Sequence, residues 1–181
     1  MPATVSPIVN DPKRLAAVRR IVPLYRPPST TFDRLTRLAA ELLEAPVALL
    51  TLVEPDRQFF VSSYGLPDDI AQARQTPIEY SICQHVVTGG MPLIVPDAAL
   101  DLRLDGNLAV VEMGVASYAG IPLKSPDHFA VGALCVLDFI PRDWTDDKLA
   151  VLADLAAIAM DELRLSVLDR QVTFEREWRA T

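Results

Sequence analysis

The two cysteines, Cys83 and Cys135, are the side chains of this sequence with the greatest intrinsic reactivity. They show none of the paired spacings that indicate a structural zinc site or a disulfide framework. We expect Cys83 to be the second residue of a short helix, where the helix dipole lowers a thiol pKa and favours the reactive thiolate. Cys83 is therefore a candidate redox sensor or covalent attachment point. The alternative is a small buried hydrophobe, because an unpaired cysteine is commonly buried.

Polar and aromatic side chains near Cys83 could contact a ligand. Gln84 and His85 follow it directly in the segment SICQHVV, and we expect both to lie away from the apolar side of the helix, where they bind a ligand or face water. Tyr118 begins a predicted strand, and its ring could close one wall of a cavity while its hydroxyl reaches a polar ligand. As a core residue Tyr118 would need no ligand.

A charged loop adds Asp97, Asp101 and Arg103, from the segment PDAALDLRL. An arginine can hold a carboxylate or a phosphate through two parallel hydrogen bonds. The alternative is a surface ion pair between Asp101 and Arg103. The sequence shows no Ser-His-Asp set, no metal-binding pair of histidines and no glycine-rich phosphate loop, so we expect neither catalysis nor a metal site.

These candidates depend on a sheet whose centre we place at residues 117–138. Two apolar runs, Ser117–Leu123 and Val131–Asp138, flank a short polar interval, which predicts a β-hairpin. The second run is apolar on both faces, so it should be a central strand that is covered on each side. The other predicted elements are helices over 11–22, 30–44 and 81–89 (capped by Ser81), strands over 47–53, 58–64 and 93–95, and loops over 65–75 and 96–111, the second with room for one helical turn.

A long helix is predicted from Thr145, whose side chain caps a first turn that carries Asp146 and Asp147. If this helix continues to Arg179, it is about 50 Å long, much longer than a domain of this size can cover. Its apolar seam of Leu165, Leu168 and Val172 then implies a partner helix, and a homodimer through residues 165–181 is expected. The alternative is a frayed tail beyond Leu168.

Length and composition predict one globular domain. The 181 residues are 50% hydrophobic and 23% charged, which argues against disorder. The net charge of −7 disfavours nucleic acid and anionic membrane surfaces as partners, because both are bound through clustered basic side chains. No apolar stretch reaches the roughly 20 residues needed to span a bilayer. We therefore expect a cytoplasmic protein.

The order of the predicted elements, together with several local segments, resembles the GAF domain, a sensory and regulatory module. The resemblance covers residues 11–164, after a flexible lead over 1–10 and before a helix extension over 165–181. The sequence departs from the family pattern at Leu24-Tyr25-Arg26, at Leu104 and at Ser117. The segments that carry the resemblance are DPKRLAAVRRI, TTFDRLTRLAAELLEAPVALLTLVEPDRQFF, SICQHVV, PLIVPDAALDLRL, SYAGIPL and VGALCVLD.

The resemblance implies an α+β fold with a six-stranded antiparallel sheet, terminal helices on one face, and a small-molecule pocket roofed by the short helix and loops on the other. It also implies that the long C-terminal helix passes a signal to an output domain or partner protein. The ligand stays unnamed. The residues that would line the pocket are Tyr80, Cys83, Gln84, His85, Asp97, Arg103, Tyr118 and Cys135.

Three functions follow from the resemblance. The first is a non-catalytic sensor that binds a small molecule, and the second is a degenerate domain that serves for dimerisation or docking. The third is a thiol-based redox sensor or reductase that uses Cys83, although the cysteine cluster of the family's methionine sulfoxide reductases is absent. Gln84 stands where bilin-binding relatives have a histidine after the cysteine, so we expect neither a bilin nor a haem cofactor.

Overall fold

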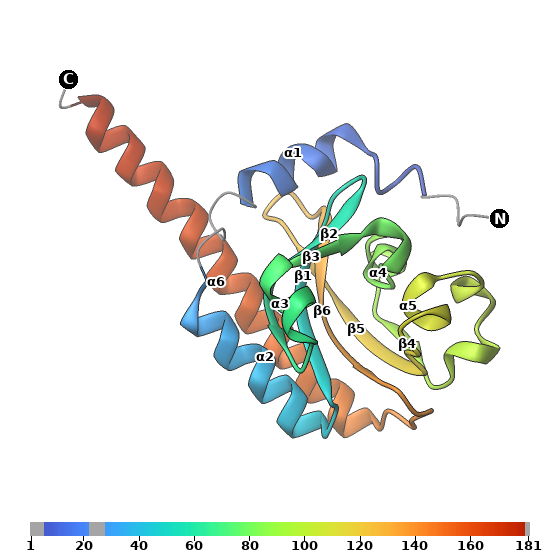
Figure 1. Ribbon diagram of the computed structural model, residues 1–181. Coiled ribbons are helices and arrows are strands. Elements are labelled where there is room, and N and C mark those ends of the chain that lie inside the picture. Colours follow the sequence, from blue (N-terminus) through green and yellow to red (C-terminus); the bar gives the residue numbers. More distant parts are fainter. Residues whose placement is uncertain (1–5, 22–27, 180–181) are drawn as a thin grey trace.

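The computed structural model describes residues 6–21 and 28–179, and side chains as far as Leu168. At its centre is a six-stranded antiparallel sheet with the strand order β3-β2-β1-β6-β5-β4 (Figure 1). The predicted α+β architecture is thereby confirmed. The strands are β1 (Val47–Val53), β2 (Arg57–Tyr64), β3 (Gln75–Pro77), β4 (Leu93–Val95), β5 (Ser117–Lys124) and β6 (Ala130–Asp138).

Strand β6 is central because its two faces enter two different cores. Leu134 and Val136 pack with the long helices, whereas Cys135 and Leu137 pack on the opposite face. A Cβ atom at Gly132 would lie 1.8 Å from the carbonyl oxygen of Thr51 in β1. The close approach of these two strands therefore requires glycine at position 132.

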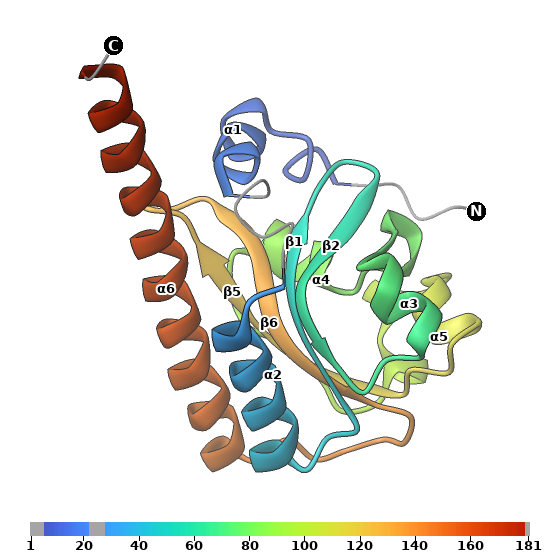
Figure 2. The ribbon, with the colours of Figure 1, turned by 60° about the vertical axis from the view of Figure 1, so that its left-hand side comes forward.

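One face of the sheet is covered by α2 (Thr30–Leu43) and α6 (Asp146–Arg179), which lie side by side in Figure 2. Helix α1 (Pro12–Ile21) packs on the same core through Val18 and Ile21. The Oγ1 atom of Thr145 accepts a hydrogen bond from the backbone N–H of Lys148 at 3.5 Å, so the predicted cap lies at the start of α6. These helices form the terminal-helix layer that the sequence predicts.

Helix α6 continues to Arg179, and its last part extends beyond the sheet (Figures 1 and 2). The alternative of a frayed tail beyond Leu168 is therefore wrong. Leu165 and Leu168 are 61% and 56% exposed, as a seam for a partner would be. The side chain of Val172, the third seam residue, lies outside the described residues. In the part of the chain that the structure describes, no helix has the length and apolarity to cross a membrane.

The other face is covered by short helices, where the sequence predicts mostly loops. Residues 65–75 contain α3 rather than loop alone, and residues 96–111 contain three single-turn helices. Each is too short to show a helical hydrophobic period, so the pattern could not reveal it. The elements of this layer are α3 (Asp68–Ala73), η2 (Ile78–Tyr80), α4 (Cys83–Gly89), η3 (Ala98–Leu100), η4 (Leu102–Leu104) and α5 (Leu108–Val111).

Residues 6–10 pack against the domain, whereas the sequence predicts an unpacked lead. Val9 is fully buried, and its carbonyl oxygen accepts a hydrogen bond from the Nε atom of Arg14 at 3.0 Å. Arg14 also donates to the carbonyl oxygen of Val53 at 2.9 Å, which ties the lead to the end of β1. The rest of the predicted lead, residues 1–5, and the segment containing Leu24-Tyr25-Arg26 lie outside the described residues.

Candidate functional site

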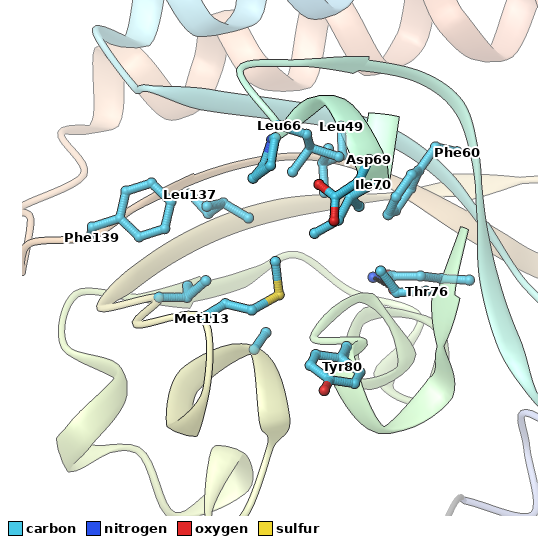
Figure 3. A pocket seen from close by; sticks show the side chains of 14 residues that line it. Leu49, Phe60, Leu66, Asp69, Ile70, Thr76, Tyr80, Met113, Leu137 and Phe139 are labelled. Carbon is cyan, nitrogen blue, oxygen red and sulfur yellow. Dashed lines mark hydrogen bonds between the residues drawn. The ribbon is translucent and has the colours of Figure 1, made fainter. Parts of the chain in front are cut away.

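A cavity of about 400 Å³ lies between the sheet and the short helices of the second layer (Figure 3). Phe60 and Phe139 stand at its two ends in this view, and Met113 lies below the space between them. Apolar side chains form most of the wall, as in many small-molecule sites. The lining residues are Leu49, Gln58, Phe60, Leu66, Pro67, Asp69, Ile70, Thr76, Tyr80, Ala109, Met113, Val115, Leu137 and Phe139.

The polar part of the wall comes from the edge of the sheet. Gln58 on β2 is paired with Thr76 on β3, so the two side chains lie next to each other. The Nε2 atom of Gln58 donates to the Oγ1 atom of Thr76 at 2.8 Å. No group in the described part of the chain donates to the Oε1 atom of Gln58, although the residue is only 5% exposed. One half of this buried amide is therefore unsatisfied.

The charge of the cavity wall comes from α3. Asp69 is the one charged residue among those that line the cavity, and Figure 3 shows its carboxylate directed toward the space above Met113. The ring of Tyr80 faces the cavity, whereas its hydroxyl points away and donates to the carboxylate of Glu112. This bond, above all, raises the pKa of the Tyr80 phenol. The wall is therefore apolar and acidic, with one amide and one hydroxyl.

The two cysteines lie beside this cavity in a separate buried cluster with Tyr118. The Sγ atom of Cys83 is 3.2 Å from the hydroxyl oxygen of Tyr118 and 3.7 Å from the Sγ atom of Cys135. A Cβ atom at Gly120 would lie 2.3 Å from the Tyr118 hydroxyl, so this glycine leaves room for the ring. None of the cluster's three polar side chains lines the cavity.

The pKa values of the three side chains in this cluster are shifted in different directions. Burial raises the pKa of the Tyr118 hydroxyl well above its usual range. The hydrogen bond with Cys83, followed by burial, raises the pKa of Cys135. The hydrogen bond with Cys135, above all, lowers the pKa of the Cys83 thiol, while burial acts in the opposite direction. Tyr118 and Cys135 therefore keep their protons at neutral pH.

The expected orientation of Gln84 is wrong. Its side chain is buried, and its Nε2 atom donates to the carbonyl oxygens of Ile78 and Ser81 at 3.0 and 2.9 Å. The Oγ atom of Ser81 accepts a hydrogen bond from the backbone N–H of Gln84 at 3.1 Å, as predicted for a cap, but α4 begins at Cys83, so Ile82 rather than Ser81 is its N-cap residue. The hydroxyl and amide of this pair hold the start of α4 onto the preceding turn, and Gln84 does not reach the cavity.

The remaining candidates lie at the outer side of the second layer. The Nε atom of Arg103 donates to the Oδ1 atom of Asp101 at 2.8 Å, which is the surface pair that the sequence suggests as an alternative. The Oδ1 atom of Asp97 accepts from the backbone N–H of Ala99 at 3.0 Å. His85 is half-buried, and burial, followed by the charge of Arg103, lowers the pKa of its imidazole.

Of the eight residues proposed from the sequence, only Tyr80 is among those that line the cavity. Sequence reasoning missed Gln58, Asp69 and Thr76. A signal for Gln58 existed, since strand alternation places it on the same face as Phe60 and makes it a polar residue facing inward. Asp69 carries no such signal, because α3 is too short to show a pattern. The described residues hold no cluster of three or more His, Cys, Asp or Glu that could bind a metal ion.

Comparison with known proteins identifies the architecture. The GAF domain family model matches residues 27–163. A cyclic di-GMP phosphodiesterase of Pseudomonas aeruginosa is 32% identical over 153 residues, which cover 83% of this chain but only 25% of that relative. The chain therefore spans about a quarter of the length of the curated relative it matches.

Solved structures agree in fold at low sequence identity. The GAF domain of a phosphoenolpyruvate-protein phosphotransferase from Coxiella burnetii has a TM-score of 0.62 at 15% identity, with 94% of this chain and 99% of that chain covered. Free methionine-R-sulfoxide reductase from Neisseria meningitidis, in complex with its substrate, has a TM-score of 0.61 at 13% identity, with 87% and 91% covered. At these identities the likeness shows the fold alone.

Proposed function

This chain belongs to the GAF domain family, and on that premise we propose that it is a non-catalytic sensory module that binds a small molecule in the cavity between the sheet, α3 and α5. The observation that carries the proposal is the cavity itself, with its volume of about 400 Å³ and its largely apolar wall. The amide of Gln58, whose Oε1 atom has no donor among the described residues, adds a polar group to this wall that could orient a ligand.

Native mass spectrometry and thermal unfolding test this proposal. A ligand that binds only the folded protein raises its melting temperature by mass action. We expect at least one compound from a panel of amines, carboxylates, nucleotides and tetrapyrroles to do so. Ala109→Phe should abolish the shift, because Ala109 lines the cavity and the larger ring fills it.

Ala99→Phe is the matched control for the cavity-filling variant. Ala99 lies on the exposed side of η3 and does not line the cavity, so this variant should keep the ligand response. The sensory proposal fails if no compound raises the melting temperature of the wild type, or if every such rise persists in Ala109→Phe. The phosphodiesterase named for the Pseudomonas relative is a protein of which the matched residues cover only 25%.

Helix α6 is the output element of the proposed sensor. Two copies of the chain form a homodimer through this helix in the proposal. Ile158, Leu165 and Leu168 are all more than half exposed along the helix and support this role. The same face supports a second candidate function, a dimerisation or docking module that needs no ligand. Deletion of residues 166–181 should then yield a folded monomer by sedimentation. A deletion variant that still dimerises would show that this seam is not the interface.

A thiol-based function is the third candidate, and the 3.7 Å contact between the Cys83 and Cys135 sulfurs favours it. One molecule of hydrogen peroxide would oxidise the two thiols to a disulfide and be reduced to two molecules of water. Both cysteines are buried, so this step requires an opening that admits the peroxide. Cys83→Ser should abolish any thiol-dependent response. An unchanged response in that variant would remove this candidate.

A further inference from the structure

We propose that the cavity selects apolar amines and rejects anionic ligands, nucleotides included. This inference rests on the proposed sensory function and adds the chemical class of the ligand. The wall contains no lysine, arginine or histidine among its described residues, and Asp69 is its one charged side chain. A phosphate or carboxylate inside this wall would be desolvated without a cation to pair with it, which is strongly unfavourable.

The position of Asp69 favours a cation at the mouth of the cavity. The residue is exposed and lies in the first turn of α3, and its carboxylate faces the cavity space (Figure 3). Among the described residues it forms no ion pair. The net charge of −7 adds a weak attraction for cations over longer distances.

The inner wall suits an aromatic or branched apolar body. Phe60, Met113 and Leu137 offer apolar contact surface, and Met113 adapts to irregular ligand shapes. The Gln58 amide lies beside Thr76 at the edge of the sheet, and its Nε2 atom donates to the Thr76 hydroxyl at 2.8 Å. This corner is the polar end of an otherwise apolar inner wall.

The substitution Asp69→Asn separates charge from shape. We would measure the affinities of tryptamine, tryptophol and indole-3-acetate, which share one ring system and carry a positive, a neutral and a negative side group. An exposed carboxylate contributes modestly, so tryptamine should bind roughly threefold more tightly than tryptophol and about tenfold more tightly than indole-3-acetate. In Asp69→Asn, tryptamine and tryptophol should bind equally.

Asp68→Asn is the matched control. Asp68 is exposed and lies in the same turn of α3, but it does not line the cavity, so its substitution should keep the preference for tryptamine. Equal affinities of the three indoles in the wild type, tighter binding of the acetate, or no binding of tryptamine at millimolar concentration would overturn the inference.

The outcome also separates this inference from the proposed function. Cyclic di-GMP or another anion that binds in a manner blocked by Ala109→Phe would overturn the ligand class and leave the sensory function standing. Failure of every compound class in the thermal panel would overturn both. Tryptamine binding that Ala109→Phe leaves unchanged would place the amine outside the cavity and refute the inference as well.

Discussion

The unsatisfied amide of Gln58 predicts that the ligand-free protein can be stabilised at the expense of its proposed binding site. In the double variant Gln58→Met and Thr76→Val, an unbranched apolar chain replaces the amide and a branched one replaces the hydroxyl. Both substitutions keep the approximate volumes, so the cavity wall should keep its shape. We expect this variant to be more stable than the wild type.

The expected gain in the free energy of unfolding follows from the hydrogen bonds of the Gln58 and Thr76 side chains. Replacing both partners of the 2.8 Å bond between Gln58 and Thr76 by apolar groups is close to neutral. Removing the Oε1 atom, which has no donor in the described part of the chain, relieves a desolvation penalty of about 1–3 kcal/mol. The single variant Gln58→Met should gain less, because it leaves the buried Thr76 hydroxyl without its donor.

Chemical denaturation and calorimetry provide the assay. A domain of this size should gain about 2–4 °C in melting temperature for each kcal/mol. The ligand response of the double variant should weaken at the same time, as expected where function opposes stability. A double variant no more stable than the wild type would refute the reasoning, since the Oε1 atom would then already be satisfied in solution.

Three further predictions concern groups away from the cavity. Arg14→Ala should lower the free energy of unfolding by about 3–5 kcal/mol in urea denaturation, because it leaves two buried carbonyl oxygens without a donor. The control Arg20→Ala removes only an exposed ion pair and should cost about 1 kcal/mol or less. The lowered pKa of His85 means that the folded state resists its protonation, so the free energy of unfolding should fall as pH drops below about 6.5. His85→Asn should flatten that part of the curve of stability against pH. A curve identical to that of the wild type would contradict this prediction. Cys83 and Cys135 should react with a thiol reagent only as fast as the protein opens, and rapid labelling of the native protein would show that the buried cluster is accessible.

The sheet and the long helices could be predicted because each carries a hydrophobic pattern over many residues. Residues 131–138 are apolar on both faces, and the structure places them in the central strand β6. The continuous apolar positions after Thr145 likewise predicted the long α6. Short elements such as α3 lack this repetition, so local sequence cannot distinguish them from loops.

The site was harder to predict because its residues come from separate segments of the chain. Reactivity drew attention to Cys83 and Cys135, but the structure packs their sulfurs together in the core. Gln58 and Thr76 become neighbours only through the pairing of β2 with β3, and that edge strand is three residues long. Asp69 lies near them only because α3 folds over the sheet. Such a set depends on tertiary geometry, which a single sequence does not display.

The cavity and helix α6 lie on opposite faces of the sheet, so a signal between them must cross it. Strand β6 connects the two, because Leu137 lines the cavity while Leu134 and Val136 pack in the same core as Leu152 of α6. Coupling of this kind is reciprocal: a ligand that tightens an α6-mediated dimer must itself bind the dimer more tightly, by the same factor. Titrating the ligand into the full chain at protein concentrations below and above the constant of the proposed dimerisation gives its affinities for monomer and dimer, and their ratio is that factor. A ligand that fills the cavity with identical affinity in both states would show that its binding is not coupled to α6.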